Sequence, residues 1–327
     1  MILLWGVEDD APLALVREEL ERRSAPLLFL CQTKSLKYHI ETRFGRTVCG
    51  CIEGPGTRVR LEQIGAAYIR PHDFRKFPEF AGKHPESIAW RHVSTFDDIL
   101  VSWSELTGAL VLNRPSAMAS NNSKPFQSRL IQETGFHVPD TLLTTDPRAA
   151  LEFASGQTPV IYKSISGVRS IVRRLSLRRR KALDDVAWCP TQFQQWIEGT
   201  DYRVHVVGSK LFACRILSDA DDYRYDAACM EPAELPREIM LRCLQLSERF
   251  NLPLAGIDLR LSTGGEWFCF EVNPSPAYSC FETASGNQIS AAIADLLVEA
   301  DRRAPSPEET RPRFSAETWT MAFPAKG

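Results

Sequence analysis

The first third of the chain alternates short apolar runs with an amphipathic stretch. Residues 2–7 are apolar, and in the stretch 8–12 that follows, an Asp can cap a helix and Pro12 suits its first turn. The next apolar residues recur at helical spacing, namely Leu13, Val16 and Leu20. Because residues 26–31 are apolar again, the pattern predicts a βαβ unit and therefore a parallel sheet.

The same patterns predict the elements that complete a first lobe. Strands are expected at 46–52, 66–70 and 109–113, with a helix at about 94–106. The sequence Asn113-Arg114-Pro115 follows the last of these strands and marks a boundary, since proline interrupts regular structure.

The second half predicts a mixture of helices and strands. A helix from Ser123 to Thr134 ends at Gly135, a typical C-terminal glycine, and Asp146 caps a further helix that has Pro147 in its first position. Strands are predicted at 158–164, 193–197, 202–207 and 211–217, with tight turns at 198–200 and 208–209. Amphipathic helices are predicted at 234–250 and 288–303.

Length and composition narrow the class of protein. With 327 residues the chain exceeds what one hydrophobic core usually serves, so two or three lobes are expected. A net charge of −2 argues against a protein that coats nucleic acid or an acidic membrane. No apolar run approaches the roughly 20 residues of a membrane span, and the N-terminus lacks the basic region of a signal peptide. Nine cysteines without paired Cys-x-x-Cys units predict reduced thiols in a cytoplasmic protein.

Three oxygen-bearing side chains near the C-terminal end form a candidate metal site. Glu271 and Asn273 lie two positions apart in an apolar strand and therefore share a face. Asp258 joins them if residues 255–261 form the partner strand of a hairpin that turns at 263–265. Mg²⁺ takes one or two carboxylates together with phosphate oxygens and water, which this set suits. The simpler alternative is a hairpin with three exposed polar groups.

Cations in apolar strands form a second candidate group. Lys163 follows three apolar residues, and a buried ammonium there needs a counter-charge that a phosphate would supply; Lys124 begins a helix. The small residues of the loop 164–170 would let backbone N–H groups approach a phosphate. Arg203 and Arg215 are predicted on adjacent strands, where a guanidinium binds a carboxylate or phosphoryl group in a bidentate manner. The alternatives are lysines that reach solvent and arginines in structural ion pairs.

These positions together resemble the ATP-grasp superfamily, and within it the RimK-like carboxylate–amine ligases. The resemblance covers roughly residues 113–297 and depends on the order and spacing of several short motifs. These motifs are Asn113-Arg114-Pro115, Lys124 with 135–141, Tyr162-Lys163, Gln194-Gln195-Trp196-Ile197, Asp201-Tyr202-Arg203, 255–258 and 270–274.

The resemblance implies an α/β (α+β) chain, with an ATP-grasp fold preceded by a βαβ pre-ATP-grasp domain. The implied domains are 1–113 for the pre-ATP-grasp domain and 114–303 for the ATP-grasp domain. The latter divides into a small ATP-covering lobe at about 140–196 and a C-terminal lobe at about 197–303. Residues 304–327 are rich in Pro, Glu, Thr and Arg and are predicted to form a loosely ordered tail.

The resemblance also implies roles for individual residues. The implied phosphate-binding lysines are Lys124 and Lys163, and the implied hinge that binds the adenine edge is Gln195, Trp196 and Ile197. Asp201 is similar to the acidic residue near the ribose, while Arg203 and Arg215 match arginines near the γ-phosphate and the acyl phosphate. The implied ligands of Mg²⁺, or alternatively Mn²⁺, are Asp258, Glu271 and Asn273. Many relatives have Glu at the position of Gln195, so the nucleotide contacts of that side chain stay open.

The implied activity is an ATP-dependent ligase that forms an acyl phosphate from a small-molecule or peptide carboxylate and joins it to an amine or, less often, to another nucleophile. A narrower alternative is a peptide maturase that modifies a ribosomally made precursor. An alternative of another class is an ATP-grasp kinase or a non-catalytic ATP-binding regulator. Dimers are common among relatives, so a homodimer is one expected state, and neither nucleic acid nor a membrane is an expected partner. Residues 68–76 combine aromatic side chains with three cations, which suits an anionic substrate, a peptide or a solvated loop.

Overall fold

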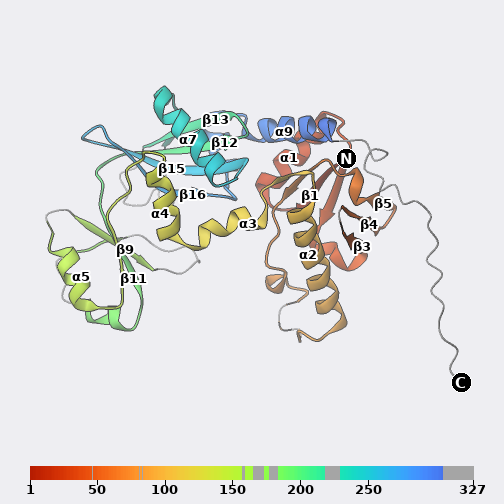
Figure 1. Ribbon diagram of the computed structural model, residues 1–327, viewed down its shortest axis with the longest axis horizontal. Coiled ribbons are helices and arrows are strands. Elements are labelled where there is room, and N and C mark those ends of the chain that lie inside the picture. The colour runs from red at the N-terminus through yellow and green to blue at the C-terminus, as the bar shows by residue number, and fades with distance from the viewer. Residues whose placement is uncertain are drawn as a thin grey trace, which may run out of the picture.

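The computed structural model describes residues 1–45, 47–80, 82, 84–156, 159–164, 173–176, 183–217 and 229–304. Most of the predicted loop at 164–170, and the predicted tail from residue 305 onward, lie outside these ranges. Figure 1 shows three parts in a row, with the first lobe at one end, the small lobe at the other, and the sheet of the C-terminal half between them. The mixed α/β architecture agrees with the predicted fold class.

The first lobe is built on a parallel sheet of four strands in the order β2-β1-β6-β7. The strands are β1 (Ile2–Gly6), β2 (Leu27–Cys31), β6 (Ala66–Ile69) and β7 (Leu110–Leu112). Helices α1 (Ala11–Arg22) and α9 (Ile289–Arg303) share one hydrophobic core with this sheet, and α2 (Ile88–Leu106) shares the other. Covered on both faces, β1 is buried at every position, which explains its unbroken apolar run. The predicted βαβ start is confirmed.

Two expectations for the first lobe are wrong in detail. A separate antiparallel sheet consists of β3 (His39–Phe44), β4 (Val48–Gly54) and β5 (Thr57–Arg60), of which the sequence predicted only the middle strand. The outer strands keep polar residues on a solvent face and therefore show no apolar run. Helix α2 begins at Ile88, not near residue 94, because the Ser87 hydroxyl accepts the N–H of Trp90 and caps the helix.

The small lobe contains a four-stranded sheet in the order β10-β9-β11-β8. Its elements are β8 (Thr141–Thr144), α5 (Pro147–Ala154), β9 (Val160–Ser164), β10 (Arg173–Arg174) and β11 (Thr191–Gln195). The predicted cap Asp146 is confirmed, since its carboxylate accepts the N–H of Arg148. One face of the sheet packs its apolar side chains with α5 in a small core that includes Val160 and Phe193. Strand alternation places Lys163 on the other face.

The central sheet has five antiparallel strands in the order β14-β13-β12-β15-β16. The strands are β12 (Gly199–Val207), β13 (Lys210–Leu217), β14 (Cys229–Pro232), β15 (Leu254–Ser262) and β16 (Trp267–Asn273). Helices α4 (Lys124–Glu133) and α7 (Arg237–Arg249) share one hydrophobic core with one face of it. The remaining short elements are α3 (Pro115–Met118), α8 (Ser279–Ser285) and 3₁₀ turns at Gln32–Lys37, Leu61–Gln63, Phe74–Lys76, Ala119–Asn122 and Leu183–Ala187.

The predicted turn at 198–200 is wrong, whereas the turns at 208–209 and 263–265 are confirmed. Gly199 already belongs to β12, and residues 196–198, which connect β11 to it, form no turn. Glycine is required there by close packing: a Cβ on Gly199 would lie 2.0 Å from the carbonyl oxygen of Leu261 on the neighbouring strand.

Asn113 joins the first lobe to the central sheet. Its buried side chain donates to the carbonyl oxygen of Leu254 at 2.6 Å and to that of Pro274, and it accepts the N–H of Leu254 at 3.2 Å. The division of the chain into domains at this residue stays a prediction, and α9, from the second predicted domain, packs on the sheet of the first lobe. Among the described residues, no helix is long and apolar enough to cross a membrane.

Candidate functional site

The three predicted metal ligands lie together on the central sheet. Asp258 in β15 pairs directly with Glu271 in β16, and Gly256 pairs with Asn273. Paired residues on antiparallel strands point to the same face, so the three side chains share the face opposite α4 and α7. The two carboxylates are each a little over a quarter exposed, at 29% and 28%, and are therefore accessible to a ligand.

Two of the predicted cations neutralise these carboxylates. The ammonium of Lys124, at the start of α4, donates to Glu271 and, at 3.2 Å, to the amide oxygen of Asn121. Arg203 lies opposite Asp258 in the sheet and donates to its carboxylate at 2.6 Å. A row of four charged groups therefore crosses α4, β16, β15 and β12, with the two carboxylates between the two cations.

Arg203 is held by a buried environment. A Cβ on Gly256 would lie 2.4 Å from a guanidinium nitrogen of Arg203, so this glycine makes room for the arginine. Its Nε donates to Nε2 of His205 at 3.4 Å, and its guanidinium lies 5.6 Å from the centre of the Phe281 ring. Burial, and then the charge of Arg203, hold the pKa of His205 well below its usual range. The imidazole is therefore neutral and able to accept this hydrogen bond.

Arg215 is not brought together with Arg203, although the predicted adjacent strands are confirmed. Arg215 pairs with Tyr202, one residue before Arg203, so the two arginines point to opposite faces of the sheet. Arg215 donates to Glu231 across β13 and β14 at 2.8 Å, and both side chains are 45% exposed.

The predicted hinge is organised by Arg260, a residue to which the sequence analysis gave no role. Arg260 donates to the backbone carbonyl of Ile197 at 2.7 Å and to both carboxylate oxygens of Asp201 at 2.6 and 2.7 Å. Its guanidinium lies 4.7 Å from the centre of the Trp196 ring. A cation between apolar residues in a strand was the available signal, the same one that identified Lys163.

The backbone of the hinge already has protein partners at two positions. The N–H of Gln195 donates to the carbonyl of Asp140 at 2.9 Å, and the N–H of Trp196 donates to that of Pro159 at 2.7 Å. The Trp196 ring also lies 4.2 Å from the guanidinium of Arg174 in β10. Trp196 is therefore the point at which an arginine of the small lobe and an arginine of the central sheet meet.

Lys163 lies in the small lobe, away from α5. It pairs with the buried Gln192 of β11, and both side chains point to the face that does not carry the lobe's core. The two predicted phosphate-binding lysines therefore lie in different parts of the molecule. Lys163 is in the small lobe, and Lys124 is at the start of α4, beside the central sheet.

A family model for the RimK-like ATP-grasp domain matches residues 120–297, more than half of the chain. The chain belongs to this RimK-like ATP-grasp family. All the predicted site residues fall within the matched region.

Curated relatives of this RimK-like chain are probable alpha-L-glutamate ligases. The protein from Histophilus somni (strain 2336) is 28% identical over 192 residues, which are 55% of this chain and 64% of the relative. The protein from Xanthomonas euvesicatoria pv. vesicatoria (strain 85-10) is 26% identical over 216 residues, or 61% of this chain and 72% of the relative. The chain thus spans less than two thirds of the length of the first of these relatives.

Solved structures match the fold over a larger share of the chain. Macrocyclase MdnC from Microcystis aeruginosa MRC, bound with precursor peptide MdnA, has a TM-score of 0.77 at 21% identity, covering 91% of this chain and 100% of that one. A RiPP-associated ATP-grasp ligase from Chryseobacterium gregarium, in complex with ADP and a leader and core peptide, has a TM-score of 0.76 at 24% identity, covering 91% and 96%. The ATP-grasp fold of the chain is therefore established.

The donor set of this ATP-grasp chain fits a magnesium ion that is shared with a nucleotide. Among the described residues no group of three His, Cys, Asp or Glu side chains could hold a metal ion. Asp258 and Glu271 supply two carboxylates and Asn273 an amide oxygen, which is the partial set that Mg²⁺ takes when phosphate oxygens complete its shell. The bonds from Lys124 and Arg203 to these carboxylates reduce the negative charge available to a metal that arrives alone.

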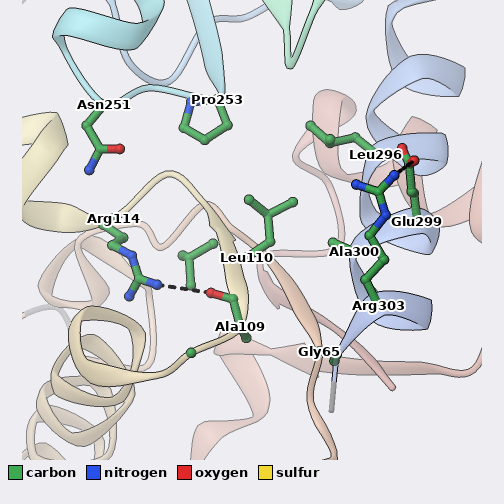
Figure 2. A pocket seen from close by; sticks show the side chains of 13 residues that line it. Gly65, Ala109, Leu110, Arg114, Asn251, Pro253, Leu296, Glu299, Ala300 and Arg303 are labelled. Atoms are coloured by element: carbon green, nitrogen blue, oxygen red, sulfur yellow. Dashed lines mark hydrogen bonds and ion pairs between the residues drawn. The ribbon is translucent and has the colours of Figure 1, made fainter.

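A cavity elsewhere in the molecule is separate from this site. It has a volume of about 590 Å³ and lies among β7, α9 and the loop after α7, and none of the predicted site residues lines it. Figure 2 shows that its cationic side chains have partners: Arg303 pairs with Glu299, and Arg114 donates to the carbonyl of Ala109. Arg114 also donates to the carbonyls of Ser104 and Thr107, so it closes the end of α2.

Proposed function

We propose that this protein is an ATP-dependent ligase that activates a carboxylate as an acyl phosphate and joins it to an amine of an amino acid or peptide. The observation that carries the proposal is the row of Lys124, Glu271, Asp258 and Arg203 on one accessible face of the central sheet. Oxygen ligands and fixed cations on one surface suit phosphoryl transfer, in which catalysis consists mainly of positioning and electrostatic stabilisation.

The proposed roles divide between the two lobes. Lys163 in the small lobe and Lys124 on the central sheet hold the phosphates of ATP, while the hinge from Gln195 to Ile197 holds the adenine. Arg203 stabilises charge on the transferred phosphoryl group, a role that the close packing of its guanidinium against Gly256 supports. We leave Arg215 out of the catalytic set because it points to the opposite face.

Asp258, Glu271 and Asn273 would hold Mg²⁺, which when bound neutralises phosphate charge and orients the reacting oxygens. Asp201 acts through the hinge rather than on the ribose, because Arg260 holds both of its carboxylate oxygens. The nine cysteines are all free thiols, which supports the proposal that the protein works in the cytoplasm.

A peptide maturase that condenses groups within one precursor is the second candidate. Neighbours crystallised with precursor, leader or core peptides match this chain over its first lobe as well as its ATP-grasp region, covering 91% of it. The peptides bound by these proteins of the same fold support a peptide substrate for this chain.

The experiment that tests the proposal combines ADP and phosphate release with mass spectrometry. The protein, ATP and Mg²⁺ are incubated with pools of amino acids, small carboxylates and peptides that carry Asp, Glu, Lys, Ser and Thr. Equal ADP and phosphate with two substrates joined less one water supports the ligase, and one peptide lighter by one water supports the maturase. A product heavier by one phosphoryl group, or no ADP from any pool, would overturn the proposal.

A further inference from the structure

Arg70 lies where the first lobe meets the segment that follows the proposed metal ligands. It comes directly after β6, at the carboxyl end of the parallel sheet, and its side chain is 10% exposed. Its Nε donates to the carboxylate of Asp10 at 2.7 Å. Asp10 is 8% exposed and also accepts the N–H of Leu13, so it is fixed as the cap of α1. The pair is therefore a rigid, almost buried point of the first lobe.

The second end of the Arg70 guanidinium reaches across to the central sheet. Its Nη1 donates to the hydroxyl of Ser275 at 2.9 Å and to the carbonyl of Pro276 at 3.3 Å. The backbone N–H of Ser275 in turn donates to the amide oxygen of Asn273 at 3.0 Å. One residue of the first lobe is thus two hydrogen bonds away from the oxygen that Asn273 would offer to a metal.

We propose that Arg70 is a positioning residue that, through Ser275, orients Asn273 for binding of the divalent metal with nucleotide. The proposal rests on the metal assignment made for the proposed function. Mg²⁺ requires near-ideal octahedral geometry, so a neutral amide ligand contributes only if its oxygen is held in place. Removing a direct hydrogen-bonding partner of a metal ligand typically lowers metal affinity by about 10-fold to 100-fold. Arg70 acts one step further away, because the direct partner of Asn273 is the backbone N–H of Ser275.

The two contacts of Arg70 together require an arginine, and Arg70 is not the sole link between the first lobe and the central sheet. A planar guanidinium offers separate N–H groups to Asp10 and to Ser275, whereas a lysine offers one compact ammonium. The attachment of the first lobe to the central sheet has other buried bonds, those of Asn113 and that of the Tyr278 hydroxyl to the carbonyl of Pro12 at 2.6 Å. Loss of Arg70 should therefore disturb the metal site more than the docking of the lobes.

The test measures Mn²⁺ binding to the full chain in the presence of ADP, by electron paramagnetic resonance titration. The variants are Arg70→Gln, Arg70→Lys, Ser275→Ala and the double variant Arg70→Gln/Ser275→Ala. Arg75→Gln is the matched control, because Arg75 is exposed and bonds only to nearby Asp73 in the interactions described. Ser275→Ala keeps the buried Arg70–Asp10 pair and so probes the connection in a chain whose lobe contacts are intact.

We expect Mn²⁺ affinity weaker by up to about 10-fold in the Arg70 variants and in Ser275→Ala, because each keeps the Ser275 N–H that bonds to Asn273 but frees the residue that carries it. We expect no further loss in the double variant and no change in Arg75→Gln. Wild-type affinity in folded Ser275→Ala and Arg70→Gln would overturn the proposal, as would losses that multiply in the double variant. Absence of Mn²⁺ binding by the wild type would overturn it too. A wild type that binds Mn²⁺ with ADP but forms no product would instead remove the proposed ligase activity and leave this proposal standing.

Discussion

Arg203→Gln and Arg215→Gln form a matched pair of variants that tests which face of the central sheet does the chemistry. Both arginines lie on neighbouring strands, yet they point to opposite faces. Arg203 is 7% exposed and bonds to Asp258 at 2.6 Å, so glutamine there removes a fixed positive charge beside the proposed metal site. Loss of one such preorganised group typically lowers the rate by about 10² to 10³, or about 3 to 4 kcal/mol of transition-state stabilisation.

The expected cost of Arg215→Gln is much smaller. Its partner Glu231 and Arg215 itself are each 45% exposed, and ion pairs this exposed contribute at most about 1 kcal/mol to stability. Arg203→Gln should also destabilise the fold modestly, by about 1 to 3 kcal/mol, because Asp258 keeps access to solvent after losing its partner.

The assay is the rate of ADP release at saturating MgATP, with urea denaturation of each variant to separate activity from folding. The expected result is a loss of two to three orders of magnitude in kcat for Arg203→Gln and wild-type kcat for Arg215→Gln. Equal losses in the two variants, or a loss confined to Arg215→Gln, would show that the face assigned to the site is wrong. Unchanged ATP affinity in Arg203→Gln, by calorimetry, would place its effect on the transition state rather than on binding.

Four further variants test other parts of the site and fold. Lys163→Ala should weaken ATP binding by about 10-fold or more, since it removes a charge-assisted contact to phosphate; calorimetry with unchanged affinity would exclude this lysine from the site. Glu271→Ala should lower turnover by at least about 100-fold while the melting temperature stays close to that of the wild type, and near-normal ADP release would contradict the metal assignment. Arg260→Met should destabilise the chain by about 3 kcal/mol in urea denaturation, because it leaves the Asp201 carboxylate without its bidentate partner, and adding Asp201→Asn should recover part of that loss. Burial raises the pKa of Asp97 to about 6, so ionisation of this carboxyl disfavours folding: the penalty is absent below the unfolded-state pKa of about 4 and complete above about 6. Asp97→Asn should therefore stabilise the chain by up to about 3 kcal/mol at pH 8 and negligibly at pH 4. Equal effects at both pH values would contradict the shift.

The sequence predicted the elements that carry continuous or periodic apolar residues. The buried strand β1, the caps of α1 and α5 and the hairpin of β15 and β16 all follow from local patterns. The polar strands β3 and β5 escaped prediction, because strands at a solvent face lack an apolar run. The role of Arg260 escaped because its partners lie near residue 200, and only the register of β12 and β15 brings them together.

The predicted turn between the strands of Arg203 and Arg215 already implies that the two side chains point to opposite faces of the sheet, although the sequence analysis grouped them together. The predicted two-residue turn at 208–209 pairs Val207 with Lys210, and counting back along both strands pairs Arg203 with Cys214. Arg215, one residue further, must then face the other way. A turn of known length therefore determines to which face of the sheet each side chain of its hairpin points, provided that no bulge intervenes.

The hairpin of the metal site shows what happens when a bulge does intervene. Near its turn the pairing is regular and reaches Leu259 opposite Cys269. Regular pairing would then place Asp258 opposite Phe270, and Glu271 would point toward α4 and α7. The register shifts at this point, so Asp258 lies opposite Glu271 and Phe270 is the extra residue.

Alternation alone places Glu271 and Asn273 on one face, but only the bulge adds Asp258 to them. The ring of Phe270 lies 5.4 Å from the guanidinium of Arg260, which also holds the hinge carbonyl of Ile197. The bulge that assembles the proposed metal site is therefore in contact with the residue that organises the proposed adenine site. Because both depend on the same pair of strands, a change in register between β15 and β16 would disturb the two ends of the nucleotide site together.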